Sequence, residues 1–314
     1  MKTALIFPGQ GAQYPGMGQD LYQASAAVRE LFEAAQQAVS FPVCDTLFSG
    51  SDEDLKRTDI TQVAVTLINL SAAAVLKERG VEPDAVAGFS LGEYAALVIA
   101  GVLKPEDIFP LVKVRGEIMA EESQALVDES GSPGMAAVIG IAPEAVSEAL
   151  QGRSDVFSAN LNSPLQTVVS GTAQGLAEAQ TLLKEAGARR VIRLKVSGPF
   201  HSPLLQRAKE RIAEHIADLQ FSDPRLPLFS NVTGKQIASG DEAKKLCLDH
   251  VISPVRWVDE ERNLMEYGIT RFIEAGPGAV LGGLMEGLLK KEPHEGVRVA
   301  SAGTMESIEA VTAQ

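Results

Sequence analysis

Cysteine is nearly absent from this sequence, which has only Cys44 and Cys247 in 314 residues. The two lie far apart in the chain and form no C-x-x-C pair, so neither a disulfide scaffold nor a zinc site is indicated. We expect each cysteine to act as an ordinary packing residue. No bound metal or redox cofactor is predicted.

The sequence also has little positive charge: 28 Lys and Arg residues stand against 41 Asp and Glu, for a formal net charge of −13. This balance argues against nucleic acid as the main partner. The apolar stretch at the N-terminus is too short for a signal peptide and breaks at Pro8 and Gly9. We expect no segment to be long and apolar enough to span a bilayer. The sequence therefore predicts a cytoplasmic protein without a membrane partner, and we expect a monomer.

The first part of the chain alternates strand and helix patterns. Thr3–Phe7 is a short apolar run before a Pro-Gly turn, and Ile60–Ala74 carries apolar residues at helical spacing that indicate a helix buried on most sides. Further patterns predict a strand at Ala85–Ala87 and helices at Leu91–Ala100 and Pro105–Glu121. Such alternation is typical of a mostly parallel sheet with helices around it.

The middle of the chain follows a different order. The patterns predict, in sequence, a strand, a helix, two strands, a helix and a strand: Met135–Ile139, Pro143–Leu150, Val156–Asn160, Thr167–Ser170, Ala173–Ala186 and Arg189–Leu194. The order βαββαβ is that of a ferredoxin-like unit. Ser130–Gly134 and Ser197–Pro199 have the composition of linkers. We therefore predict a small α+β domain, residues 129–197, inserted into a larger α/β domain formed by residues 1–128 and 198–314.

Behind the inserted unit the α/β pattern resumes. Helices are expected at Leu204–Leu219, Arg256–Tyr267 and up to Leu289, and strands at Leu226–Phe229 and Arg271–Glu274.

Gly88-Phe89-Ser90-Leu91-Gly92 is a G-x-S-x-G pattern between a predicted strand and a predicted helix. A serine at such a junction lies on a tight turn with its hydroxyl exposed, and the glycines provide room for the turn. The helix N-terminus and the Leu91 backbone N–H favour a developing oxyanion. The alternative is a glycine-rich turn with a capping serine, but the context favours Ser90 as a nucleophile.

A serine nucleophile needs a base, and the chain has four histidines. His215 falls in a charged helix and His294 in a polar loop. His201 follows a turn at the domain junction, which suits a catalytic base, although it could instead cap the helix that follows.

Six segments together carry a family resemblance: Phe7–Gln13 (FPGQGAQ), Gly88–Glu93 (GFSLGE), Val114–Gly116 (VRG), Asn162–Pro164 (NSP), Gly198–Ser202 (GPFHS) and Glu274–Gly278 (EAGPG). In this order they resemble malonyl-CoA:acyl carrier protein transacylases over essentially the whole chain. They also resemble the acyltransferase domains of polyketide synthases. The resemblance implies a hydrolase-like α/β domain with an inserted ferredoxin-like domain.

The resemblance also implies roles for individual residues. Ser90 matches the nucleophile and His201 the base, and the backbone amides of Gln10 and Leu91 match the oxyanion hole. Arg115, whose own context alone would predict a solvated helix residue, matches the arginine that holds the malonyl carboxylate. An arginine fork is suited to a carboxylate, because it donates two parallel charge-assisted hydrogen bonds. Phe200 matches the residue that goes with malonyl selectivity in polyketide acyltransferases.

Two positions depart from the family pattern. Phe89 stands where histidine is usual, and we expect altered packing there without loss of the chemistry. His250 stands where many members have glutamine, a position whose backbone carbonyl orients the catalytic histidine. Any residue supplies a carbonyl, but the substitution leaves open whether His201 alone titrates in the site.

The resemblance implies malonyl-CoA as substrate and an acyl carrier protein as partner, with fatty-acid synthesis as the pathway and a free-standing polyketide acyltransferase as the alternative. The densest basic stretch, Lys184–Lys195, is either an ordinary solvated face or a docking surface for the acidic carrier or for CoA phosphates. Gly276-Pro277-Gly278 is expected to be a turn near the site and not a phosphate cradle. A serine hydrolase or a non-catalytic carrier-binding subunit are the alternatives from other classes.

Overall fold

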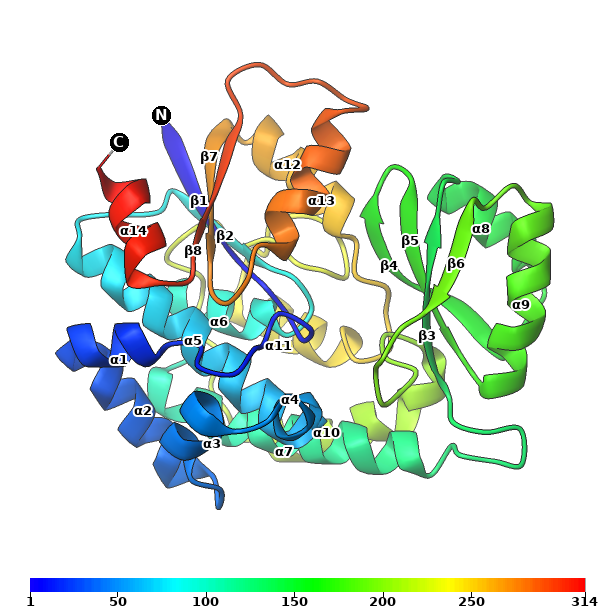
Figure 1. The fold of residues 1–314 in the computed structure, drawn as a ribbon, viewed down its shortest axis with the longest axis horizontal. Coiled ribbons are helices and arrows are strands. Elements are labelled where there is room, and N and C mark those ends of the chain that lie inside the picture. Colours follow the sequence, from blue (N-terminus) through cyan, green and yellow to red (C-terminus); the bar gives the residue numbers. More distant parts are fainter. Residues whose placement is uncertain (314) are drawn as a thin grey trace.

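Residues 1–313 are described by a computed structural model, and their strands form two separate four-stranded sheets (Figure 1). The strands are β1 (Lys2–Phe7), β2 (Ala85–Gly88), β3 (Gly134–Ile139), β4 (Val156–Ser163), β5 (Gln166–Gly171), β6 (Arg190–Arg193), β7 (Ile269–Ala275) and β8 (Arg298–Ala302). The helices are α1 (Gln19–Ala24), α2 (Ala26–Ala38), α3 (Val43–Ser49), α4 (Asp52–Lys56), α5 (Thr58–Glu78), α6 (Gly92–Ile99), α7 (Pro105–Gln124), α8 (Pro143–Ala149), α9 (Ala173–Glu185), α10 (Gln206–Ile216), α11 (Gly240–Asp249), α12 (Trp257–Glu266), α13 (Val280–Leu289) and α14 (Met305–Thr312). A short 3-10 turn, Pro203–Leu205, precedes α10.

The larger sheet has the order β2-β1-β7-β8, and every pair in it is parallel. Both faces of β1 are buried: Leu5 and Phe7 pack into the core on the side of α5, whereas Ala4 and Ile6 pack toward α12 and α13. A central parallel strand covered on both faces reads as a continuous apolar run, which is why Thr3–Phe7 was recognisable. The predicted mostly parallel α/β sheet is confirmed.

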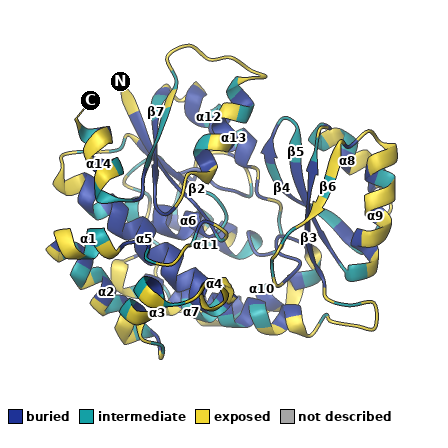
Figure 2. Cartoon of the chain, viewed as in Figure 1, coloured by how far each residue is buried: buried dark blue, intermediate teal, exposed yellow. Residues whose placement is uncertain are grey.

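Helix α5 is the central helix of this lobe, and Figure 2 shows it buried along most of its length. Its 21 residues are long and apolar enough to cross a bilayer by length and composition, so the expectation that no segment meets this test was wrong. However, 89% of the apolar window is buried against the rest of the protein. The hydrophobicity of α5 is therefore accounted for by its place in the core.

The smaller sheet is antiparallel with the order β4-β5-β3-β6. Its side chains alternate: Ala136 and Val138 on β3 pack against α8 and α9, whereas Met135 and Ala137 face the larger lobe. Elements and strand order are those of the predicted βαββαβ unit. The regular elements of this unit span residues 134–193, and the domain boundaries at 128/129 and 197/198 remain a prediction.

The strand expected at Leu226–Phe229 is the clearest error in the predicted elements. Leu228 makes only an isolated parallel bridge to Val86 on β2, and Phe229 one antiparallel bridge to Gln236. Pro227 has no N–H to donate, so the ladder cannot extend from Leu228 toward Leu226. The patterns also left α1–α4, α11, β8 and α14 unrecognised, mostly short or strongly amphipathic elements.

Candidate active site

The G-x-S-x-G segment forms a sharp turn between β2 and α6. Ser90 has φ +51°, a left-handed conformation that side chains rarely adopt. A Cβ on Gly88 would collide with the backbone of Gly92, and a Cβ on Gly92 would collide with the Phe7 carbonyl. The glycines of the motif are therefore required because three stretches of backbone meet here.

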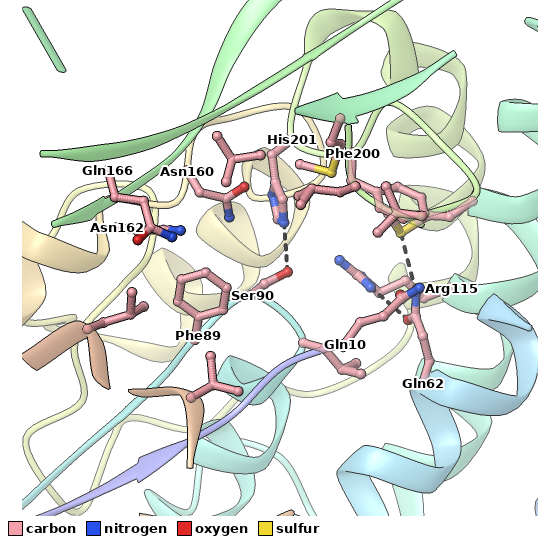
Figure 3. Close-up of a pocket in the computed structure, with 18 residues that line it drawn as sticks. Gln10, Gln62, Phe89, Ser90, Arg115, Asn160, Asn162, Gln166, Phe200 and His201 are labelled. Carbon is pink, nitrogen blue, oxygen red and sulfur yellow. Dashed lines mark hydrogen bonds between the residues drawn. The ribbon is translucent and has the colours of Figure 1, made fainter. Parts of the chain in front are cut away.

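The Ser90 hydroxyl points at the ring of His201, with 2.7 Å between Ser90 Oγ and His201 Nε2 (Figure 3). The other ring nitrogen, Nδ1, lies 2.9 Å from the backbone carbonyl oxygen of His250. A carbonyl can only accept, so Nδ1 carries the hydrogen and Nε2 is free to take the serine proton. The sequence thus predicted a Ser90–His201 pair and a carbonyl from position 250, and the fold brings these three groups together.

The environment of His201 keeps its ring neutral. The side chain is buried, and burial lowers its pKa to about 4, assisted by the positive charge of Arg115. Hydrogen bonds to backbone carbonyls at positions 250 and 253 oppose this shift without reversing it. At neutral pH the imidazole is therefore unprotonated and ready to act as a base.

The loop after β1 lies directly against the nucleophile turn. A Cβ on Gly9 would sit 2.5 Å from the Phe89 carbonyl oxygen and 3.5 Å from the Leu91 backbone nitrogen. Only glycine allows this approach, which brings the Gln10 backbone beside the N-terminus of α6. Gln10 and Leu91 both line the cavity beside Ser90, and an oxyanion hole made of their two amides stays a prediction.

Arg115 is buried in this site, with 2% of its surface exposed, so its interpretation as a solvated helix residue was wrong. Helix α7 packs along α5, the helix that carries Gln62. Arg115 Nη1 donates to Gln62 Oε1 at 2.7 Å, and the guanidinium lies over the Tyr94 ring, 5.0 Å from the centroid. Within residues 1–313 the buried Nε has no hydrogen-bond partner.

These groups open onto one cavity of about 180 Å³ between the two lobes (Figure 3). The larger lobe contributes Ser90 and Arg115, and the smaller sheet contributes Met135 and Val168. The other lining residues include Gln10, Gln62, Phe89, Leu91, Met119, Asn160, Asn162, Gln166, Phe200, His201, Val280 and Leu284. A cavity with an apolar lining, one nucleophile and one buried cation suits a small acyl group that ends in a negative charge.

The two departures from the family pattern have distinct surroundings. Phe89 packs edge-on against Trp257, with 5.6 Å between ring centroids. The His250 ring is buried 4.9 Å from the His201 ring, and burial together with the charges of His201 and Arg115 holds its pKa well below the usual value. Both imidazoles are thus neutral near pH 7.

The remaining predicted features lie outside the cavity. His215 on α10 and His294 in the loop before β8 are exposed. The basic residues around β6 are also exposed, namely Lys184, Arg189, Arg190, Arg193 and Lys195. In the part of the chain that the structure describes, no three His, Cys, Asp or Glu side chains gather as a metal site would require.

The sequence analysis missed Gln62, which holds Arg115, and Asn231, which contacts the nucleophile turn. Asn231 follows the short apolar run Leu226–Phe229. The carboxyl ends of parallel segments meet at one sheet edge, so a polar residue there was the available signal.

The fold and the Ser-His site define the class of protein: this chain belongs to the acyl transferase domain family, whose model matches residues 4–309. Curated relatives include the malonyl CoA-acyl carrier protein transacylase of Bacillus subtilis, 39% identical over 91% of this chain and 90% of its own. The enzyme of the same name from Staphylococcus aureus is 36% identical over 98% and 97%.

Solved structures agree. MCAT from Streptococcus pneumoniae superposes with a TM-score of 0.90 at 37% identity and covers 99% of both chains. A malonyl-transacylase in complex with a type II PKS acyl-carrier protein superposes with a TM-score of 0.91 at 31% identity, covering 100% of this chain and 99% of its own. The fold and family expected from the sequence are confirmed.

Proposed function

We propose that this acyltransferase moves a malonyl group from malonyl-CoA to the phosphopantetheine thiol of an acyl carrier protein, through an ester on Ser90. The observation that carries the proposal is the placement of buried Arg115 in the same cavity as the Ser90–His201 pair. A malonyl group is an acyl group with a terminal carboxylate. In this site Ser90 can attack the acyl carbonyl, and the Arg115 guanidinium can bind the carboxylate.

The proposed cycle has two halves. His201 Nε2 takes the hydroxyl proton as Ser90 Oγ attacks the thioester carbonyl, and the resulting oxyanion lies between the Gln10 and Leu91 amides. The C–S bond breaks, CoA thiolate receives the proton from His201, and malonyl-Ser90 remains. The carrier thiol then gives its proton to His201 and attacks the ester, and Ser90 recovers a proton as it leaves.

The exposed basic stretch around β6 supports a carrier docking site near the cavity. Its chain continues from Arg193 into Leu194 and Val196, which line the cavity. The protein as a whole is acidic, so an acidic partner needs a local positive surface to approach. Among the relatives, one malonyl-transacylase has been solved bound to a carrier protein.

Two features of the site favour a transferase over a hydrolase. His201 is oriented by a backbone carbonyl and not by a carboxylate, and the cavity holds a buried arginine. Fatty-acid synthesis is the proposed pathway, with a polyketide synthase as the alternative. We also propose that the protein is a cytoplasmic monomer and that it works without a bound cofactor.

Intact-mass analysis tests the proposal. Malonyl-CoA should add one malonyl group to the wild type and none to Ser90→Ala. The adduct should be discharged far faster by holo carrier protein than by water. Undiminished labelling of Ser90→Ala would remove the nucleophile assignment, and equal discharge by water would favour a hydrolase.

A further inference from the structure

The buried carboxamide of Asn231 spans both sides of the nucleophile turn. Its Oδ1 accepts a hydrogen bond from the Ser90 backbone N–H at 2.6 Å, and its Nδ2 donates to the Gly88 carbonyl oxygen at 2.6 Å. The side chain is fully buried, so water does not compete for either contact. One side chain therefore supplies the donor and the acceptor that a neighbouring strand would supply.

The reason for this arrangement lies in the segment that was predicted to be a strand. Residues 226–229 run beside β2 but pair with it only at Leu228, and the chain turns away at Ser230. The polar groups of Gly88 and Ser90 lie beyond the end of that pairing. Buried groups left unpaired there would destabilise a turn in which Ser90 already adopts a left-handed conformation.

The orientation of the Asn231 amide is itself fixed. Its Nδ2 also donates to Glu260 Oε1 at 2.8 Å, and its backbone N–H donates to Glu93 Oε2 at 2.7 Å. A flipped amide would direct its oxygen at two acceptors and its nitrogen at the Ser90 N–H, so only one orientation satisfies every partner. Burial raises the pKa of Glu93 to about 8, so the carboxyl group that contacts the Asn231 backbone is mostly uncharged at neutral pH.

We propose that Asn231 is a positioning residue for the nucleophile: its carboxamide holds Gly88 and Ser90 in the left-handed turn that directs Oγ at His201. It also occupies the Ser90 N–H, so the N–H of the next residue, Leu91, is the one that the turn leaves for an oxyanion. This inference rests on the proposed role of Ser90 as nucleophile. It adds a residue from the 230–234 turn, which lies outside the six segments that carry the family resemblance.

The test compares Asn231→Asp with Asn263→Asp. The first keeps the shape and the acceptor but replaces the Nδ2 donor by an oxygen that faces Gly88 and Glu260. The control removes a similar amide–carbonyl bond, from Asn263 Nδ2 to the Gly234 oxygen at 2.8 Å, in the same turn and away from Ser90. Asn231→Ala serves as a second, uncharged variant if the aspartate variant fails to fold.

Two rates are measured for each folded variant at matched protein concentration: malonylation by malonyl-CoA and phosphonylation by a fluorophosphonate probe, which reports serine reactivity without any malonyl contact. A misdirected nucleophile costs on the order of a hundredfold in rate. We expect that loss in the labelling rate of both reactions for both Asn231 variants. In malonyl transfer it should appear in kcat, with KM for malonyl-CoA changed by less than about threefold. Asn263→Asp should keep the wild-type kcat even where its melting temperature falls.

The positioning role is wrong if an Asn231 variant, once folded, keeps kcat within about twofold of the Asn263→Asp control. It is also wrong if only KM rises. Failure of the proposed function gives a different result: the wild type would then be phosphonylated at Ser90 but not malonylated, and the Asn231 effect on phosphonylation could still be measured. Phosphonylation that persists in Ser90→Ala would show that Ser90 is not the nucleophile, on which both the proposed function and the role of Asn231 depend.

Discussion

Arg115→Ala removes the positive group that the cavity offers to an acyl chain with a free carboxylate. Nη1 is held by Gln62 and the guanidinium face rests on Tyr94, so the fork is fixed before any ligand enters. Among residues 1–313 no ion pair engages it. A malonyl carboxylate would therefore not have to displace a protein carboxylate.

The magnitude follows from the lost contacts. Hydrogen bonds to charged groups contribute roughly 1.5–3 kcal/mol each, and a bidentate contact makes two of them. Water admitted by the smaller side chain recovers part of this, which leaves a net loss of about 3 kcal/mol. That corresponds to a fall on the order of a hundredfold in kcat/KM for malonyl-CoA.

Acetyl-CoA provides the internal reference, because it has no carboxylate to lose. Arg115 also contributes to the low pKa of His201, but burial is the larger cause and remains, so the base stays neutral in an assay at pH 8. The measurement is kcat/KM for both thioesters in the wild type, Arg115→Ala and Arg115→Lys. We expect acetyl-CoA to hold or gain and the lysine variant to recover malonyl transfer only in part, since a point charge cannot reproduce the fork.

Lys113→Ala is the matched control on the same helix, because Lys113 pairs with Glu117 toward the surface of α7. The ratio of malonyl to acetyl specificity should not change in that variant. Equal losses for both thioesters in Arg115→Ala would mean that the arginine only supports the fold of the site. Substrate choice would then have to reside elsewhere in the cavity.

Three further predictions concern the base, its protonation and the carrier. His250→Gln should retain most of the kcat, because only a backbone carbonyl contacts His201, and a loss as large as that of His201→Ala would implicate the His250 ring itself. His201 has a pKa lowered from 6.5 to about 4, so its contribution to stability is present above pH 6.5 and is lost as pH falls toward 4. Relative to His201→Gln, the wild-type unfolding free energy should therefore fall by about 3 kcal/mol across that window, measured by denaturant titration at several pH values. Arg190→Glu should raise KM for the carrier protein about tenfold at low salt without slowing malonylation by malonyl-CoA, and an unchanged carrier KM would exclude this surface as the docking site.

The patterns in the sequence predicted most of the regular elements around the site, because each of these elements buries apolar side chains at a regular spacing. β1 is buried on both faces and α5 on nearly every side, so each leaves a continuous apolar signal. The βαββαβ order of the smaller sheet was readable for the same reason. Edge segments such as residues 226–229, where a proline interrupts pairing, carry a strand composition without forming a ladder.

The proposed nucleophile and base were recognisable because the chemistry proposed for them constrains neighbouring residues. Ser90 needs glycines at fixed spacing, and those glycines are visible in the chain. Arg115 carries no such local mark. From its own neighbours it reads as an exposed helix residue, and only the family resemblance pointed to a role in the site.

The sequence by itself thus determined the fold class, the family and the Ser90–His201 pair, since each depends on contacts between residues close in the chain or on a motif preserved in order. Only the tertiary structure decided that Arg115 is buried beside Gln62, that the His250 ring lies close to the His201 ring, and that Asn231 is hydrogen-bonded to the turn that carries Ser90. These contacts join residues from separate elements, and side-chain direction and burial there depend on how the elements pack. Local patterns report the faces of one helix or strand, and they do not specify which side chain of another element meets them.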